Sequence, residues 1–333
     1  MTETTNIAHF LQLAGAIFAA LLGLAFGSFL NVVLTRMPEG ESIATPGSHC
    51  RNCDHTLDWW ENLPLLSWLF LRGRCRQCGT SIGLRYPLIE LAIAVLWTAV
   101  WFKFSTPAFT VNATNTAIPQ SFAQTCVVLI AYALFTWLLV ALAALDALYF
   151  WLPDRLTVPG IAFGLLLAVF TAWQMSPSFR HIDWWMKLLP DLWMRALEAI
   201  VCGGLILIIR LGYWLVRRRE GMGLGDAKLM AMLGAWLGLA GGLESFAIAI
   251  FAASAAALLW IALSFLRSRS NPESNPASSP ELNPGPGSEP GSESSNNWAQ
   301  MPLPFGTFLC LAALSEIFYP AWLSVWWIGK FMP

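Results

Sequence analysis

Long apolar segments separated by shorter polar segments form the main pattern of this chain. A membrane-spanning helix needs about 20 predominantly apolar residues. The pattern therefore predicts an all-α polytopic membrane protein with about eight transmembrane helices. Only Gly241 and Gly242 separate the sixth span from the seventh, so these two form a tight helical hairpin if both cross the membrane. The expected spans are about 12–34, 86–104, 122–145, 157–174, 193–215, 226–241, 244–266 and 303–328.

Composition agrees with a membrane location. Hydrophobic residues make up 56% of the 333 residues and charged residues 12%, whereas soluble domains carry about 25% charged residues. The 18 Trp and 21 Phe residues are typical of aromatic belts at membrane interfaces. The first ten residues lack the basic region of a signal peptide, so the first apolar segment is expected to remain as a span. With a net charge of −1 and no basic stripe, no nucleic-acid partner is expected.

Basic residues are concentrated in alternate connections, which predicts the orientation because cytoplasmic loops are enriched in Lys and Arg. The opposite connections, about 105–121 and 175–192, contain only Arg180 and Lys187. Both termini are therefore expected outside the cytoplasm. The cytoplasmic basic residues are Arg36, Arg51, Arg72, Arg74, Arg76 and Arg85 in the first loop, Arg217, Arg218 and Arg219 after the fifth span, and Arg267 and Arg269 after the seventh.

A Ser-, Pro-, Asn- and Gly-rich segment, 268–300, lies between the seventh and eighth spans. Such a composition cannot bury enough apolar surface to fold, so a disordered cytoplasmic linker is expected. The chain then divides into a first transmembrane helix (1–35), a cytoplasmic domain (36–85), a transmembrane core (86–266), the linker (267–301) and a last transmembrane helix (302–333).

Four cysteines in the first cytoplasmic loop form two C-x2-C pairs separated by 21 residues. Two such pairs place four thiolates within tetrahedral reach, the pattern of a structural zinc site. A reducing compartment disfavours disulfides, and the alternative is four free thiols. Because sulfur would fill all four positions, a bound zinc would be structural. The four are Cys50, Cys53, Cys75 and Cys78, whereas Cys126, Cys202 and Cys310 lie in spans and are expected to be small core residues.

An aspartate opens the sixth span in the sequence GMGLGDAKLM. Gly223 and Gly225 flank Asp226, and glycine allows a substrate backbone to approach closely. An ionisable group at the membrane edge is a candidate functional residue. The alternative is an N-cap aspartate. Lys228, two residues further on, either reaches lipid phosphate or meets an acidic substrate side chain.

A second aspartate, Asp146, lies near the cytoplasmic end of the third span. Two spans separate it from Asp226, and this even number of crossings returns the chain to the same face. Two close carboxyl groups share a proton, and one can then act as general base towards water while the other acts as general acid. The alternative for Asp146 is a helix-end acid exposed to water at the headgroups. Asp154 is expected to be an N-cap.

Other polar and small residues have less specific interpretations. Glu90 either pairs with Arg85 or binds a substrate amine. Two glycine pairs with small-x-x-x-small spacing predict close helix packing, namely Gly23 with Gly27 and Gly234 with Gly238.

The motifs of this chain, and their order along the sequence, resemble those of the bacterial prepilin peptidases, or type IV leader peptidases. The resemblance covers most of the chain. It is carried by GSFLNVVLTRMP (27–38), by CRNC, ENLPLLSWLFLRGRCRQCG and IGLRYPLIE in the cysteine-containing loop, by D-x6-PD from Asp146 to Asp154, by G-x-G-D from Gly223 to Asp226, and by PFG (304–306).

The resemblance implies a GxGD-type intramembrane aspartyl protease of the bacterial inner membrane, with Asp146 and Asp226 as its catalytic pair and 86–266 as its peptidase core. It would cleave the leader of type IV prepilins or type II secretion pseudopilins after a glycine at the cytoplasmic face. It would then methylate the new N-terminal amine with S-adenosylmethionine. The four cysteines would bind Zn²⁺, in a domain that the family associates with the methyltransferase activity.

Two positions depart from the family pattern. Leu148 stands where a second acid is frequent, and Ala94 stands where a glycine associated with methylation is common. No G-x-G-x-x-G loop is present to bind the methyl donor, so its binding residues are not placed. A peptidase without methyltransferase activity is therefore an alternative, and a proton-coupled transporter using the paired acids is a remote one.

Overall fold

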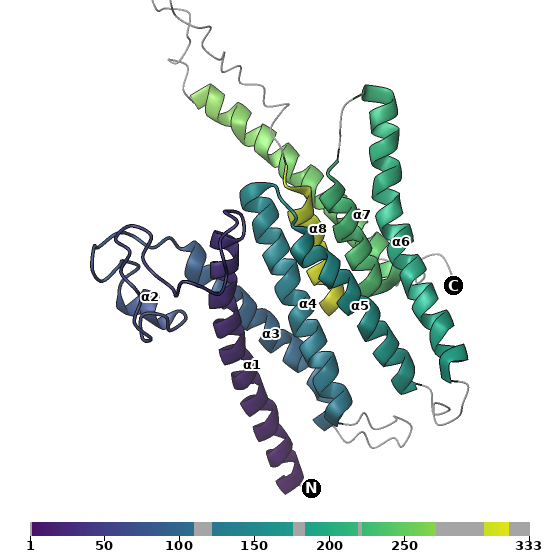
Figure 1. Ribbon diagram of the computed structural model, residues 1–333, viewed down its shortest axis with the longest axis horizontal. Helices are drawn as coiled ribbons and strands as arrows, with labels where there is room; N and C mark the ends of the chain where they lie inside the picture. Colours follow the sequence, from purple (N-terminus) through teal and green to yellow (C-terminus); the bar gives the residue numbers. More distant parts are fainter. Residues whose placement is uncertain (1, 110–121, 176–183, 219–221, 271–302, 320–333) are drawn as a thin grey trace, which may run out of the picture.

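The computed structural model describes residues 2–109, 122–175, 184–218, 222–270 and 303–319. This part of the chain is helical and contains isolated β-bridges but no strand (Figure 1). Its helices are α1 (Thr2–Arg36), α2 (Leu66–Phe70), α3 (Arg85–Phe109), α4 (Phe122–Tyr149), α5 (Asp154–Met175), α6 (Trp184–Arg217), α7 (Leu224–Ser270) and α8 (Phe305–Phe318).

Six of these helices are long and apolar enough to cross a membrane, namely α1, α3, α4, α5, α6 and α7. The prediction of a multi-pass helical membrane protein is therefore confirmed. The count is lower than the expected eight for two reasons. The expected spans 226–241 and 244–266 both fall within α7, and α8 has only 14 residues. The remainder of the expected span 303–328 lies outside the described residues, as does most of the expected linker.

A break at Gly238 divides α7 into two arms. Gly238 has φ 77° and ψ −179°, a conformation that side chains with a Cβ rarely adopt. A Cβ built on Gly242 would lie 3.7 Å from the Cα of Gly234, whereas eight residues of straight helix span about 12 Å. The chain therefore reverses direction, and the longer arm returns past the shorter one (Figure 1). The hairpin occurs as expected, but it turns at Gly238 and not at Gly241–Gly242.

Close contact between α1 and α3 depends on the first glycine pair. A Cβ built on Gly23 would lie 2.6 Å from the Cα of Ala94, and one built on Gly27 would lie 2.6 Å from the Cα of Glu90. Real Cβ atoms essentially never approach so closely, so the two backbones touch only because these positions are glycine. The predicted close packing is confirmed for this pair.

Helix α8 packs against α4 and α7. Between α4 and α7, the rings of Phe135 and Trp236 stack with centroids 4.3 Å apart. The indole N–H of Trp236 donates to the carbonyl oxygen of Gly160 on α5 at 2.8 Å. These contacts hold the end of α4 and the beginning of α7 at the same end of the bundle (Figure 1).

We expect Gly27→Ala to destabilise the protein, because the added methyl group collides with the backbone of α3 and overpacking costs about 1–3 kcal/mol. Thermal unfolding in detergent should show a lower melting temperature. The matched control is Gly212→Ala, since nothing lies within 4 Å of a Cβ built at that helical position. Equal melting temperatures for the two variants would contradict the assigned α1–α3 contact.

Candidate active site and metal centre

Two aspartates meet where α4 ends and α7 begins. Asp146 lies in the last turn of α4, and Asp226 is the third residue of α7. The Asp146 carboxyl group acts electrostatically on that of Asp226, and both act on the thiol of Cys310 in α8, so the two predicted acids lie in one neighbourhood. Asp146 is only 6% exposed. This burial excludes the alternative of an acid exposed at a helix end.

Helix α8 holds the carboxyl group of Asp146. The backbone N–H of Thr307 donates to Asp146 Oδ2 at 2.7 Å. The Thr307 hydroxyl lies 3.1 Å from the same oxygen and 3.0 Å from the carbonyl oxygen of Ala143. Thr307 is the third residue of α8, and its N–H also lies 3.2 Å from the carbonyl oxygen of Pro304, the N-cap residue. The N–H is therefore shared, and Asp146 makes the shorter of the two contacts.

Asp226 also lies at a helix N-terminus, in this case that of its own helix, α7. Its carboxyl group points back towards Gly223, just before α7 begins, with Oδ2 3.5 Å from a Cβ built on that glycine. A side chain at the third helical position that reaches back in this way is one half of a capping box. Asp226 is therefore not the N-cap itself. Both carboxyl groups face the N-terminus of a helix, where the helix dipole stabilises negative charge.

Two glycines leave room for Leu152 and for the acid pair. A Cβ built on Gly306 would lie 3.0 Å from Asp146 Oδ2, and one built on Gly225 would lie 2.9 Å from Leu152 Cβ. The space beside Gly225 is thus filled by Leu152. Gly223 is exposed, and among the described residues a Cβ built on it would meet only Asp226 and the backbone nitrogen of Gly225, so no described residue blocks the approach over Gly223.

Lys228 binds a third acid. Its Nζ lies 2.6 Å from Oδ1 of Asp154, the first residue of α5. Both side chains are substantially exposed, so solvent screens this ion pair. The ion pair links the beginnings of α5 and α7, whereas the sequence indicated a lipid or substrate contact for Lys228.

The four loop cysteines form a metal-binding arrangement. Their Sγ atoms all lie within 4.8 Å of one another, with 3.8 Å between Cys50 and Cys78 and 4.0 Å between Cys53 and Cys75. Tetrahedral zinc with Zn–S bonds of about 2.3 Å separates its sulfurs by about 3.8 Å. The residues therefore fit a zinc ion with no open coordination position.

Both cysteine pairs lie in turns with the same backbone hydrogen bonds. Cys50 N–H donates to the carbonyl oxygen of His55, and Cys75 N–H donates to that of Thr80, both at 2.9 Å. Hydrogen bonds from Thr80 and from the Asn52 side chain lower the pKa of the Cys78 thiol to about 5. The thiolate, which is the form that binds metal, is therefore populated at neutral pH. Of the cysteines in the spans, Cys202 and Cys310 are buried, as expected for core residues, and Cys126 is half-buried.

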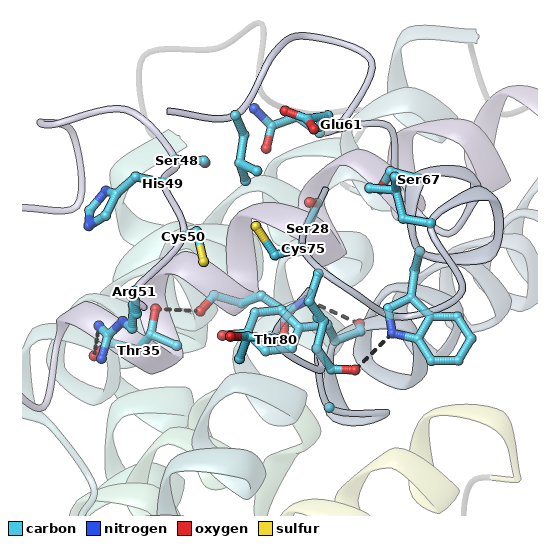
Figure 2. Close-up of a pocket in the computed structure, with 18 of the residues that line it drawn as sticks. Ser28, Thr35, Ser48, His49, Cys50, Arg51, Glu61, Ser67, Cys75 and Thr80 are labelled. Carbon is cyan, nitrogen blue, oxygen red and sulfur yellow. Dashed lines mark hydrogen bonds between the residues drawn. The ribbon is translucent and has the colours of Figure 1, made fainter. Parts of the chain in front are cut away.

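A cavity of about 520 Å³ lies beside the cysteine cluster. Figure 2 shows Cys50 and Cys75 side by side in its wall and Glu61 nearby. The wall combines the end of α1, the cytoplasmic loop and the start of α3. Neither aspartate of the acid pair belongs to it, so the cavity and the acid pair are separate sites. Its volume falls within the usual range of about 300–1,000 Å³ for small-molecule sites.

The cavity residues missed by sequence reasoning come from three of the segments that carry the resemblance. These are Ser28, Asn31, Thr35 and Arg36 from 27–38, Glu61, Asn62, Ser67 and Trp68 from the loop, and Tyr86 and Pro87 from the start of α3.

Glu90 fixes the loop to α3. Its Oε2 accepts the backbone N–H of Leu65 at 2.8 Å, and the residue is 7% exposed. The structure therefore gives Glu90 a partner in the loop backbone, which differs from both roles weighed in the sequence. Ala94 lies one turn further along α3, against Gly23, and is not part of the cavity wall.

Comparison with known proteins identifies two matching family models. Residues 21–104 match the bacterial peptidase A24 N-terminal domain, and residues 133–261 match the type IV leader peptidase family. The chain is 36% identical to a prepilin leader peptidase/N-methyltransferase of Myxococcus xanthus, in an alignment covering 77% of this chain and 65% of that protein. A protein with the same name from Dichelobacter nodosus is 34% identical over 67% of this chain and 76% of its own length. Another, from Aeromonas hydrophila, is 30% identical over the whole of both chains. No solved structure matches the chain significantly.

We expect the purified protein to contain about one zinc ion per chain, because four thiolates at tetrahedral separation bind this ion tightly. Cys75→Ser should lower the zinc content measured by inductively coupled plasma mass spectrometry. Cys310→Ser is the control, since Cys310 lies in α8 and should leave the zinc content unchanged. Metal-free wild-type protein, or equal zinc in the two variants, would contradict the site.

Proposed function

Because this chain belongs to the type IV leader peptidase family, we propose that it is a bifunctional enzyme of the bacterial inner membrane. It removes the leader peptides of type IV prepilins or type II secretion pseudopilins after a glycine. It then methylates the new N-terminal amine. The basic residues of the loops support an active site at the cytoplasmic face.

The observation that carries the peptidase activity is the juxtaposition of Asp146 and Asp226 at two helix N-termini. One carboxylate takes a proton from water, whose oxygen attacks the carbonyl carbon of the scissile peptide bond. The other carboxyl group, protonated at that stage, gives its proton to the leaving nitrogen as the C–N bond breaks. The open approach over Gly223 supports a cleft that reads the extended backbone of the substrate.

Lys228 helps position the substrate through its ion pair with Asp154. The pair holds the start of α7 against the start of α5, and Gly225 admits Leu152 beneath the same turn. In this proposal the start of α7 positions the substrate backbone. Its own position is set by Gly223, Gly225 and Lys228.

The cavity beside the cysteines is the proposed site for S-adenosylmethionine. The residues fit such a ligand, since the cavity is large enough and two residues in its wall, Asn31 and Glu61, each have a buried oxygen with no partner in the described part of the chain. When bound, S-adenosylmethionine supplies a methyl group from its sulfonium to the deprotonated amine. Zinc, held by Cys50, Cys53, Cys75 and Cys78, keeps the loop folded around this cavity. The packing of Ala94 against Gly23, outside the cavity wall, supports retention of methylation.

The alternatives have less support. A peptidase without methyltransferase activity leaves the cavity and its unpaired oxygens without a role. A proton-coupled transporter would place its acids near the middle of the membrane, whereas Asp146 ends α4 and Asp226 begins α7.

We expect Asp146→Asn and Asp226→Asn each to abolish cleavage, because an amide can neither accept the proton from water nor supply one. Incubation with a prepilin in detergent, followed by mass spectrometry of the substrate N-terminus, measures cleavage and methylation together. A substrate already trimmed to its new N-terminus is the control. Both variants should still methylate it, which shows that they are folded. Full cleavage by either variant would refute the pair.

We expect Thr307→Val to lower kcat for cleavage about tenfold while leaving KM unchanged, since it removes the hydroxyl beside Asp146 but keeps the backbone N–H. Thr307→Ser should restore the rate, which distinguishes positioning of the carboxylate from loss of packing. Thr98→Val is the matched control, because the Thr98 hydroxyl bonds only within α3. Unchanged kcat in Thr307→Val, or failure of rescue by serine, would contradict this role.

A further inference from the structure

Two buried acceptor oxygens in the cavity wall have no partner among the described residues. The side-chain nitrogen of Asn31 donates to the carbonyl oxygen of Tyr86 at 3.1 Å, which leaves Oδ1 unpaired. Glu61 Oε2 accepts the backbone N–H of Asp58 at 2.9 Å and lies 3.1 Å from His55 Nε2, which leaves Oε1 unpaired. A buried acceptor without a donor is destabilising.

The charge of Glu61 narrows the kind of ligand group that can pair with its free oxygen. The hydrogen bond from Asp58, together with the contact to His55, holds the pKa of the Glu61 carboxyl group below its usual value. The group is therefore ionised at neutral pH. An ionised carboxylate with one free oxygen is best satisfied by a cationic donor.

The cations in the same wall are already bound to other groups. Arg36 donates to the carbonyl oxygens of Pro46 and Gly47 at 2.7 and 3.0 Å. Arg51 forms an ion pair with Glu39 at 2.9 Å. Arg76 acts electrostatically on Glu61, but its guanidinium group lies 3.7 Å from Asp58 Oδ2 and over the ring of Trp60. None of these three arginines donates to Asn31 Oδ1 or Glu61 Oε1, so a ligand that brings its own positive donor would satisfy both oxygens.

We propose that Asn31 and Glu61 bind the α-ammonium group of the methyl donor, an inference that rests on the proposed methyltransferase function. The other α-amine of the reaction belongs to the trimmed peptide. That amine must lose its proton before it attacks the methyl group, so an ionised carboxylate that stabilises its charged form would slow the reaction. The ammonium of S-adenosylmethionine stays protonated throughout. Glu61 and Asn31 therefore recognise the donor and take no part in the transfer itself.

The test compares two ligands on purified full-length protein in detergent by isothermal titration calorimetry. One is S-adenosylhomocysteine, and the other is the same molecule with hydrogen in place of its α-amino group. Wild-type protein should bind the first at least about tenfold more tightly, as expected for a charge-assisted hydrogen bond. In Glu61→Gln this preference should disappear, because the free oxygen is replaced by an amide that cannot bind an ammonium strongly.

Controls separate this effect from damage to the loop. Glu61→Gln keeps an oxygen for the Asp58 N–H, and its zinc content and cleavage rate should match wild type. Glu41→Gln, an exposed acid outside the cavity wall, should keep the wild-type ligand preference. If Glu61→Gln loses zinc, Asn31→Leu provides the second variant. It should also reduce the preference, since it removes the other acceptor.

The outcomes distinguish this inference from the proposed function. If wild-type protein binds neither ligand and methylates no substrate, the methyltransferase function itself is wrong. If wild-type protein binds S-adenosylhomocysteine but both variants keep its preference for the ammonium, only the role of Asn31 and Glu61 is wrong. Unchanged donor binding with a raised KM for the trimmed peptide would assign the two oxygens to the peptide amine and would also overturn the inference.

Discussion

The hydrogen bond from the Thr307 N–H to Asp146 is the interaction on which the acid pair depends. It joins the N-terminus of α8 to a buried carboxyl group at 2.7 Å, and the Thr307 hydroxyl adds a second contact to the same oxygen at 3.1 Å. Inside an apolar bundle, where an unpaired polar group is costly, these contacts keep Asp146 beside α8. The position of α8 between α4 and α7 is thus coupled to the position of the carboxyl group. Gly306 is necessary for this approach, because a side chain there would displace Asp146.

The acid pair and the cavity lie on different parts of the bundle, joined through packed aromatic residues. The cavity belongs to α1, α3 and the loop between them, whereas the acids belong to α4 and α7. The indole N–H of Trp137 on α4 donates to the carbonyl oxygen of Phe26 on α1 at 3.1 Å, and its ring stacks on Phe29. In the proposed function, a trimmed substrate therefore passes from the acid pair on α4 and α7 to the cavity on α1, α3 and the loop.

The sequence predicted the features that follow from local spacing and from counting spans. The cysteine pairs, the close α1–α3 packing and the meeting of Asp146 with Asp226 were all predicted in this way. The contact with Thr307 was not, because it joins residues 161 positions apart and no periodicity links them. The cavity was missed for a similar reason, since three separate segments build its wall. The turn of α7 was misplaced because Gly238, Gly241 and Gly242 are all suited to it, and only tertiary contacts select one.

The reversal at Gly238 gives the first arm of α7 only 14 residues, Leu224 to Leu237, or roughly 21 Å of helix. The hydrocarbon core of a bilayer is about 30 Å thick. The ion pair of Arg195 and Glu198 lies beside this turn, so charged groups occupy a depth where lipid chains would otherwise be. Residues 225–237 are all buried or half-buried, so protein and not lipid covers the short arm along its length. The arm can therefore stop short of the far side of the membrane without exposing its end to lipid chains.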